Sequence, residues 1–199
     1  MALTCTRCGG FGRLGRTGCR WCGAPGPPTG PVLIVTGAAG SGKSTVCAAL
    51  AGHPAVLALD ADVMAEGAAA VADGRRDYTA FWHHLLGIAL EVRDNGLVPA
   101  FCGVCLPDQV LGGALVEEFT AVHFLVLVSD EPTVRARLAA RPGSRTALAR
   151  VDLHVALDDS LRRATVTPPH TMTVLDTARW TPAMTASAAS AWSERLTGR

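Results

Sequence analysis

The sequence has almost no lysine. Its 199 residues include 18 basic side chains, of which only Lys43 is a lysine, and 17 acidic ones, for a net charge of +1. So small a charge argues against a protein that binds nucleic acid mainly by electrostatic attraction. Because arginine fills every other basic position, the single lysine suggests a site that needs a compact ammonium group.

Long apolar runs and targeting signals are also missing. No run approaches the roughly 18 apolar residues that a membrane-spanning helix needs. The N-terminus lacks the charged and then apolar pattern of a secretory signal. Apolar residues nevertheless make up 49% of the chain, which indicates a folded globular protein. We therefore expect a cytoplasmic protein with no membrane segment.

The first 24 residues differ in composition from the rest of the chain. They are rich in glycine, arginine and cysteine and carry no acidic residue. Proline and glycine dominate residues 25–31, which predicts a stiff, non-helical linker. Strand-like and helical patterns alternate from there onward, so we expect residues 32–199 to form the main domain.

Four of the seven cysteines lie in the first segment as two CxxC pairs. Cys5 pairs with Cys8, and Cys19 with Cys22, with ten residues between the pairs. Each pair has the spacing of a knuckle that grips one tetrahedral metal ion, and the glycines that follow Cys8 and Cys22 provide tight turns. Four thiolates leave no open coordination position. We therefore predict a structural Zn²⁺ site similar to a zinc ribbon, with a redox-active pair as the alternative.

The role of this segment stays open from sequence. It contains four arginines, which could contact RNA or a phosphate-bearing partner or could serve as solvated charges: Arg7, Arg13, Arg16 and Arg20. The segment could equally pack on the main domain or mediate dimerisation.

The main domain reads as five short strands separated by helices. Strands are expected at 32–36, 55–59, 97–101, 122–128 and 172–175, and helices at 43–51, 78–94, 107–119, 131–140, 151–164 and 182–196. The first strand is continuously apolar, which is typical of a parallel strand buried on both faces. The alternation predicts an α/β fold with a doubly wound parallel sheet.

A glycine-rich turn joins the first strand to the first helix. Glycines let the backbone wrap a phosphate chain with its N–H groups inward, and the helix N-terminus favours the same anion. Lys43 supplies a charge for the β- and γ-phosphates, and Ser44 offers a hydroxyl to Mg²⁺. The turn therefore predicts a P-loop that binds a nucleoside triphosphate. Its residues are Gly37, Ala38, Ala39, Gly40, Ser41, Gly42, Lys43, Ser44 and Thr45.

Two aspartates follow the second strand, in the run Leu59-Asp60-Ala61-Asp62. They should emerge at the carboxyl edge of the sheet beside the P-loop, and on one face if the chain stays extended there. The P-loop and this Asp-x-Asp run together resemble the small-molecule kinases of the nucleoside-monophosphate-kinase type, such as shikimate kinase, gluconate kinase and chloramphenicol phosphotransferase. The resemblance covers residues 31–199 and implies a P-loop sheet with strand order 2-3-1-4-5.

The resemblance implies a role for each aspartate. Asp60 helps to hold Mg²⁺ through water, and Asp62 meets the acceptor hydroxyl as general base, although the two roles could be swapped. The alternative for Asp60 is that it only caps the next helix.

The third strand lacks the Asp-Glu pair of motor-type ATPases. It ends in Phe101-Cys102-Gly103-Val104, which favours transfer to a small acceptor over mechanical ATP hydrolysis. Gly103 is expected to let the backbone approach the acceptor. A metal or redox role for Cys102 and Cys105 is possible from their spacing, but we favour packing.

An arginine-rich stretch follows the fourth strand. It contains Arg135, Arg137, Arg141 and Arg145. Its position matches the lid of these kinases, where a mobile arginine caps the transferred phosphoryl group and excludes water. The resemblance favours Arg141 and then Arg137 for this role, and a solvated arginine face is the alternative.

Adenine recognition in these kinases comes from the lid helix and from the loop after the last strand. The resemblance therefore assigns Arg141, Thr177 and Trp180 to the nucleotide, with packing as the alternative for Trp180. The acceptor is expected between the second strand and the helix 78–94. Candidates are Tyr78, Trp82, His83, Arg75 and Arg76, although Trp82 also fits the buried stripe of its helix.

These expectations combine into an ATP- and Mg²⁺-dependent phosphotransferase. Its acceptor would be a hydroxyl of a small molecule, such as a nucleoside, a sugar or a natural product. The alternatives are a nucleotide-dependent module that regulates or binds RNA through residues 1–24, and a polynucleotide 5′-hydroxyl kinase.

Overall fold

The structure is a computed structural model. It describes residues 7–10, 19, 21–24, 29–68, 71–72, 75–140 and 149–198, with only the backbone of 65–68, 71–72 and 75–76. Among the described helices, none has the length and apolar character that crossing a membrane requires.

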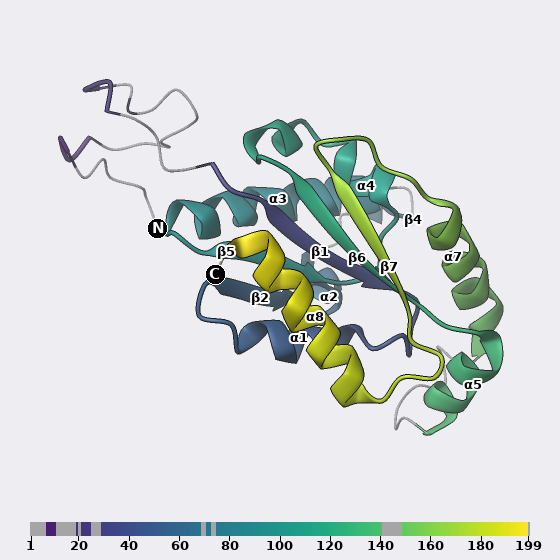
Figure 1. Cartoon of the computed structure of the whole chain (residues 1–199). Coiled ribbons are helices and arrows are strands. Elements are labelled where there is room, and N and C mark those ends of the chain that lie inside the picture. Colours follow the sequence, from purple (N-terminus) through teal and green to yellow (C-terminus); the bar gives the residue numbers. More distant parts are fainter. Residues whose placement is uncertain are drawn as a thin grey trace.

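A five-stranded parallel sheet forms the centre of the main domain (Figure 1). Its order is β2-β5-β1-β6-β7, which confirms the order 2-3-1-4-5 that the sequence predicts. The strands are β1 Val32–Gly37, β2 Val56–Asp60, β5 Val98–Cys102, β6 Val122–Val128 and β7 Thr171–Asp176. β1 lies in the middle, so the turn that follows it opens at the centre of the carboxyl edge of the sheet.

Two helices cover one face of the sheet. α1 (Lys43–Ala51) and α8 (Pro182–Thr197) lie side by side there (Figure 1). Leu33 and Val35 of β1 pack with Val46 of α1 and Trp192 of α8 in one buried cluster. Because side chains of a strand alternate between faces, the residues between these face the other layer.

The second face is covered mainly by α3 (Tyr78–Asp94), with α4 (Pro107–Leu111) and α7 (Val151–Arg163). Trp82 of α3 is fully buried, and its ring meets Phe81 and Phe101 edge-on at centroid distances of 5.9 and 6.5 Å. Truncating an aromatic residue at such a position costs roughly 3–5 kcal/mol. The core alternative for Trp82 is therefore confirmed.

The structure corrects the prediction of one helix over 107–119. α4 ends at Leu111, and a separate 3₁₀ turn, η1, spans Ala114–Glu118. The break falls at Gly112 and Gly113, because two successive glycines weaken a helix. At Gly113 a side chain would also come within 3.1 Å of His83 Nδ1, so the close packing of α3 depends on this glycine.

Three short elements between β2 and α3 were not predicted. α2 spans Ala61–Ala68, and β3 (Val71–Ala72) pairs with β4 (Arg75–Arg76) as a small antiparallel ribbon. The run is rich in alanine and glycine and has no clear apolar period, so its helical character gives little signal. α5 (Glu131–Ala140) is the remaining helix of the described chain and begins and ends as expected.

Candidate active site

The P-loop connects β1 to α1 at the centre of the carboxyl edge. Gly37, Gly40 and Gly42 have φ values of 156°, 80° and 110°. At Gly37 a Cβ would collide with the carbonyl oxygen of Leu127 and approach the Ser41 hydroxyl to 2.6 Å. Only glycine therefore allows the turn to press against β6 while it curls toward the helix.

Lys43 lies over this turn with 9% of its surface exposed. Its Nζ donates to the carbonyl oxygens of Gly37 at 3.0 Å and Ala38 at 3.2 Å, and lies 3.7 Å from Oδ2 of Asp62. Burial lowers the pKa of Lys43 below its ordinary value, and the negative charges of Asp62 and Asp60 partly offset this effect. The ammonium group is thus held between the loop carbonyls and the carboxylate of Asp62.

The two aspartates take different positions from those expected of an extended chain. Asp60 ends β2, and α2 begins at Ala61, so Asp62 lies in the first turn of a helix. Asp60 Oδ1 accepts from the N–H groups of Asp62 at 3.0 Å and Val63 at 3.4 Å, so Asp60 caps α2. A cap is the alternative role that the sequence suggests for this residue. Both carboxyl groups nevertheless line one cavity.

Gly103 allows Asp62 to sit against the end of β5. The Val104 N–H donates to Asp62 Oδ1 at 3.1 Å. A Cβ on Gly103 would lie 2.7 Å from the Cβ of Ala61 and 3.3 Å from Asp62 Oδ1. The glycine thus gives room to the aspartate and to α2, and the approach of an acceptor to its backbone stays a prediction.

The cavity above the P-loop measures about 640 Å³. Its lining combines the P-loop with the end of β2, the start of α2, the turn after β5 and α5: Ala39, Gly40, Gly42, Lys43, Ser44, Thr45, Asp60, Asp62, Val63, Val104 and Arg137. Of the other P-loop residues, Ala38 and Ser41 are buried behind this surface. Val63 was not singled out from sequence, because nothing there marked α2.

Arg137 of α5 ties the P-loop to the loop after β7. Its Nη1 donates to the Gly40 carbonyl at 3.2 Å and to Thr177 Oγ1 at 3.1 Å. Its Nη2 donates to the carbonyls of Thr177 at 2.6 Å and Trp180 at 3.4 Å. Arg141 and Arg145, also predicted for the lid, lie outside the described residues. The guanidinium of Arg137 therefore lines the cavity with both of its terminal nitrogens already hydrogen-bonded.

Thr177 and Trp180 lie near Arg137 but outside the lining of the cavity. Thr177 is fully buried, and its hydroxyl lies 3.1 Å from the carbonyl of Ser41 and 3.2 Å from that of Val128. The Trp180 side chain lines a separate shallow hollow along α8 with Met184. Thr177 thus holds the P-loop in place from behind, and a nucleotide contact for either side chain stays a prediction.

The candidates for the acceptor are spread apart. Tyr78 and His83 are exposed on α3, and Trp82 is in the core. The side chains of Arg75 and Arg76 lie outside what the structure describes. Among the described side chains, Asp62 and Val63 of α2 and Val104 after β5 line the cavity on the side of these two elements.

The pair Cys102 and Cys105 does not form a metal site. Both are buried, but Cys102 packs in the cluster under α1 and α8, and Cys105 packs in the cluster on the other face of the sheet. Burial raises the pKa of Cys105 to about 12. Cys105 also exchanges hydrogen bonds with Thr36 at 2.7 and 3.0 Å. The packing interpretation fits these positions.

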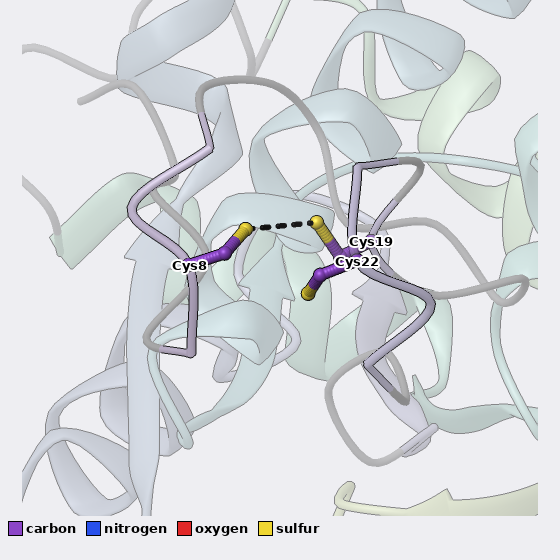
Figure 2. A group of neighbouring side chains, drawn as sticks. All are labelled: Cys8, Cys19 and Cys22. Carbon is purple, nitrogen blue, oxygen red and sulfur yellow. Dashed lines mark hydrogen bonds between the residues drawn. The ribbon is translucent and has the colours of Figure 1, made fainter.

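The cysteines of the N-terminal segment do come together (Figure 2). The sulfur atoms of Cys8, Cys19 and Cys22 all lie within 4.8 Å of one another, and those of Cys8 and Cys19 are 3.7 Å apart. Gly9 and Gly23 turn the chain after each knuckle with φ values of 68° and 66°. Three thiols at this separation suit a single metal ion. Cys5, the fourth predicted ligand, lies outside the described residues.

No protein-family model matches the chain, and no curated protein sequence matches it. Several solved structures, in contrast, are similar to this chain. A sugar kinase from Janibacter sp. HTCC2649 is 21% identical with a TM-score of 0.60, over 84% of this chain and 95% of that one.

Two further structures match over a similar span. The tunicamycin resistance protein of Deinococcus radiodurans is 16% identical with a TM-score of 0.56, over 83% of this chain and 96% of its own. The APS kinase of Mycobacterium tuberculosis, solved with AMPPNP and APS, is 18% identical with a TM-score of 0.55, over 84% of this chain and 99% of its own. The protein described here therefore has the fold of the P-loop kinases.

Proposed function

We propose that this protein is an ATP- and Mg²⁺-dependent phosphotransferase that acts on a hydroxyl group of a small molecule. The observation that carries the proposal is the position of Lys43, whose ammonium group lies between the P-loop carbonyls and the carboxylate of Asp62 in one open cavity. Phosphoryl transfer depends on positioning and on charge neutralisation, and these groups supply both.

The P-loop side of the cavity would bind the nucleotide. Backbone N–H groups of the turn and the N-terminus of α1 would hold the phosphates, and Lys43 would move from the loop carbonyls to the terminal phosphates. Ser44 and Asp60 offer a hydroxyl and a carboxylate, the hard oxygen ligands that Mg²⁺ prefers. The metal ion would neutralise charge on the β- and γ-phosphates.

Asp62 is the residue best placed to accept the proton of the acceptor hydroxyl. The Val104 N–H holds one of its oxygens, and the side chain is 51% exposed toward the cavity. A positioned carboxylate of this kind contributes roughly 10²–10⁴-fold to proton transfer. The volume of about 640 Å³ suits a nucleotide phosphate chain and a small acceptor. The similarity to a sugar kinase and an APS kinase favours this class of acceptor.

The test combines transfer and binding. The protein is incubated with ATP, MgCl₂ and a panel of hydroxyl-bearing sugars, nucleosides and natural products, and phosphorylated products are identified by mass spectrometry. Asp62→Asn should reduce transfer by roughly 10²–10⁴-fold and leave ATP affinity nearly unchanged. Asp108→Asn, at an exposed position on α4, is the matched control and should behave as wild type.

Two results would count against the proposal. Full transfer by Asp62→Asn would remove Asp62 as the base. A wild-type protein that binds no ATP in the presence of Mg²⁺ would refute the phosphotransferase altogether.

For the cysteine cluster we propose a structural Zn²⁺ ion held by Cys8, Cys19, Cys22 and, from its spacing, Cys5. The buried apolar cluster of the described part of this segment consists of Cys19 and Ala24 alone, which is far too little to hold a fold without a metal. Elemental analysis should find zinc in the wild type and in Cys47→Ala, and a loss of it in Cys8→Ser. Zinc retained in Cys8→Ser would contradict the site.

A further inference from the structure

A buried hydroxyl group lies at the end of β1, directly before the P-loop. Thr36 is fully buried, and side chains two apart on a strand share a face, so it lies on the face of Ile34 in the core that α3 covers. Valine, which has nearly the same shape, would pack well in such surroundings, whereas a buried hydroxyl is costly unless it is hydrogen-bonded. The partners of this hydroxyl therefore indicate what it does.

The Thr36 hydroxyl binds both backbone groups of one residue beyond the end of β5. Its Oγ1 donates to the carbonyl oxygen of Cys105 at 2.7 Å and accepts from the N–H of the same residue at 3.0 Å. One hydroxyl can do both, because it carries a donor and two acceptor lone pairs. Thr36 thus fixes the chain after β5 to the strand that leads into the P-loop.

The regular hydrogen bonds of the sheet stop before Cys105. The pairing of β5 with β1 closes with the Gly103 N–H, which donates to a β1 carbonyl at 2.9 Å, and α4 begins farther along the chain. Val104 and Cys105 lie between these elements. Among the residues that the structure describes, the hydrogen bonds of this pair go to the side chains of Asp62 and Thr36. The position of the pair therefore depends on these two side chains and not on secondary structure.

The same pair of residues orients the proposed base. The Val104 N–H donates to Asp62 Oδ1 at 3.1 Å, and Oδ2 of this carboxylate lies 3.7 Å from Lys43 Nζ. Under the proposed function, Lys43 turns to the phosphates, and the Val104 N–H then holds the carboxylate without it. Because Val104 directly precedes Cys105, the Asp62 carboxylate and the Thr36 hydroxyl bind the N–H groups of two successive peptide units.

We infer that Thr36 is a positioning residue for phosphoryl transfer, because its hydroxyl fixes the chain after β5 and thereby the Val104 N–H that orients Asp62. The inference rests on the proposed function of Asp62 as the base, and it assigns to that function a residue outside the lining of the cavity. The P-loop should not depend on this hydroxyl, since the backbone of Thr36 is paired with Val126 of β6 whatever side chain it carries. Loss of the hydroxyl should therefore slow transfer and spare nucleotide affinity.

The test uses the full-length protein with ATP, MgCl₂ and the panel of hydroxyl-bearing sugars, nucleosides and natural products. Thr36→Val removes both hydrogen bonds at nearly constant shape, so kcat should fall about tenfold, because a slightly displaced base loses part of its contribution. The affinity for ATP in calorimetric titrations should stay at the wild-type value. Thr36→Ser keeps the hydroxyl and should restore most of the rate. Thr173→Val on β7, two strands away from β1, is the matched control and should change neither quantity.

A double variant separates positioning from stability. If the hydroxyl acts through the carboxylate, Thr36→Val should cause no further loss of kcat in Asp62→Asn, whereas a loss that comes from a weaker fold would persist there. Unchanged kcat in Thr36→Val, or an equal loss in both backgrounds, would overturn the inference. Weaker ATP affinity in Thr36→Val would assign Thr36 a structural role and overturn it as well. A wild-type protein that binds no ATP would refute the proposed function itself and the inference with it, whereas the other outcomes concern Thr36 alone.

Discussion

The side of the cavity that we propose for the nucleotide and the side that we propose for the acceptor are built in different ways. On the nucleotide side, the side chains of Lys43, Arg137 and Thr177 donate hydrogen bonds to backbone carbonyls. On the acceptor side, Asp62 is 51% exposed and Val63 is 69% exposed on α2. Under the proposed function, recognition of the phosphates would depend on a fixed backbone, whereas recognition of the acceptor would depend on a few exposed side chains. Substitutions on the two sides should separate nucleotide affinity from the rate of transfer.

The largest effect is expected from Lys43, which touches both sides. Lys43→Ala should lower the rate of transfer on the order of 10³-fold, because it removes a buried charge aimed at the developing phosphoryl charge. Lys43→Arg should rescue little, since a planar guanidinium does not fit the two carbonyls that the ammonium contacts at 3.0 and 3.2 Å. Steady-state kinetics with ATP and the best acceptor measure both variants. Near wild-type rates in Lys43→Ala would show that the lysine is not part of the site.

A smaller effect, confined to the nucleotide side, is expected from Arg137. Arg137→Ala breaks the links from α5 to Gly40, Thr177 and Trp180, and should raise the KM for ATP about tenfold while kcat falls less. Arg135→Ala is the matched control, because Arg135 is exposed on the same helix and pairs with Glu131. A fall in kcat with an unchanged KM would instead favour the predicted role of Arg137 in capping the transferred phosphoryl group.

A substitution at Gly103 should have the opposite effect to Arg137→Ala: it should lower kcat and leave ATP affinity unchanged. Gly103→Ala places a methyl group 2.7 Å from Ala61 and 3.3 Å from Asp62, so α2 and the carboxylate must shift by a few tenths of an ångström. Since small misplacements of a base reduce proton transfer, kcat should fall several-fold while ATP affinity stays unchanged. Gly87→Ala on α3 is the control, because its nearest neighbour would lie at 3.9 Å. Loss of ATP affinity in Gly103→Ala would show that the two sides are not independent.

The same contrast explains what the sequence could predict. The P-loop and the bounds of α1, α3, β6 and α5 follow from glycine positions, apolar periodicity and caps, which act locally, whereas the order of the strands came from the resemblance to a known family. The helix α2 and the helix break at Gly112 do not follow from such local signals. The position of Asp62 depends on α2 and on two neighbouring residues about forty positions further along the chain, Gly103 and Val104, whose N–H it accepts. The acceptor side is therefore the part that local patterns could not define.

The smallest expected effect concerns the protonation of Lys43. Burial lowers its pKa, so the neutral amine should be present at lower pH than for an ordinary lysine, and bound phosphates should raise the pKa again. Because Lys43 is the only lysine, labelling with an amine-reactive reagent can be followed at this one side chain by peptide mass spectrometry, apart from the chain terminus. We expect the midpoint of the labelling rate to lie below the ordinary value of 10.5, and to move up when ATP and Mg²⁺ are present. If labelling followed an ordinary lysine and ATP left it unchanged, Lys43 would be open to solvent and the phosphates would bind elsewhere.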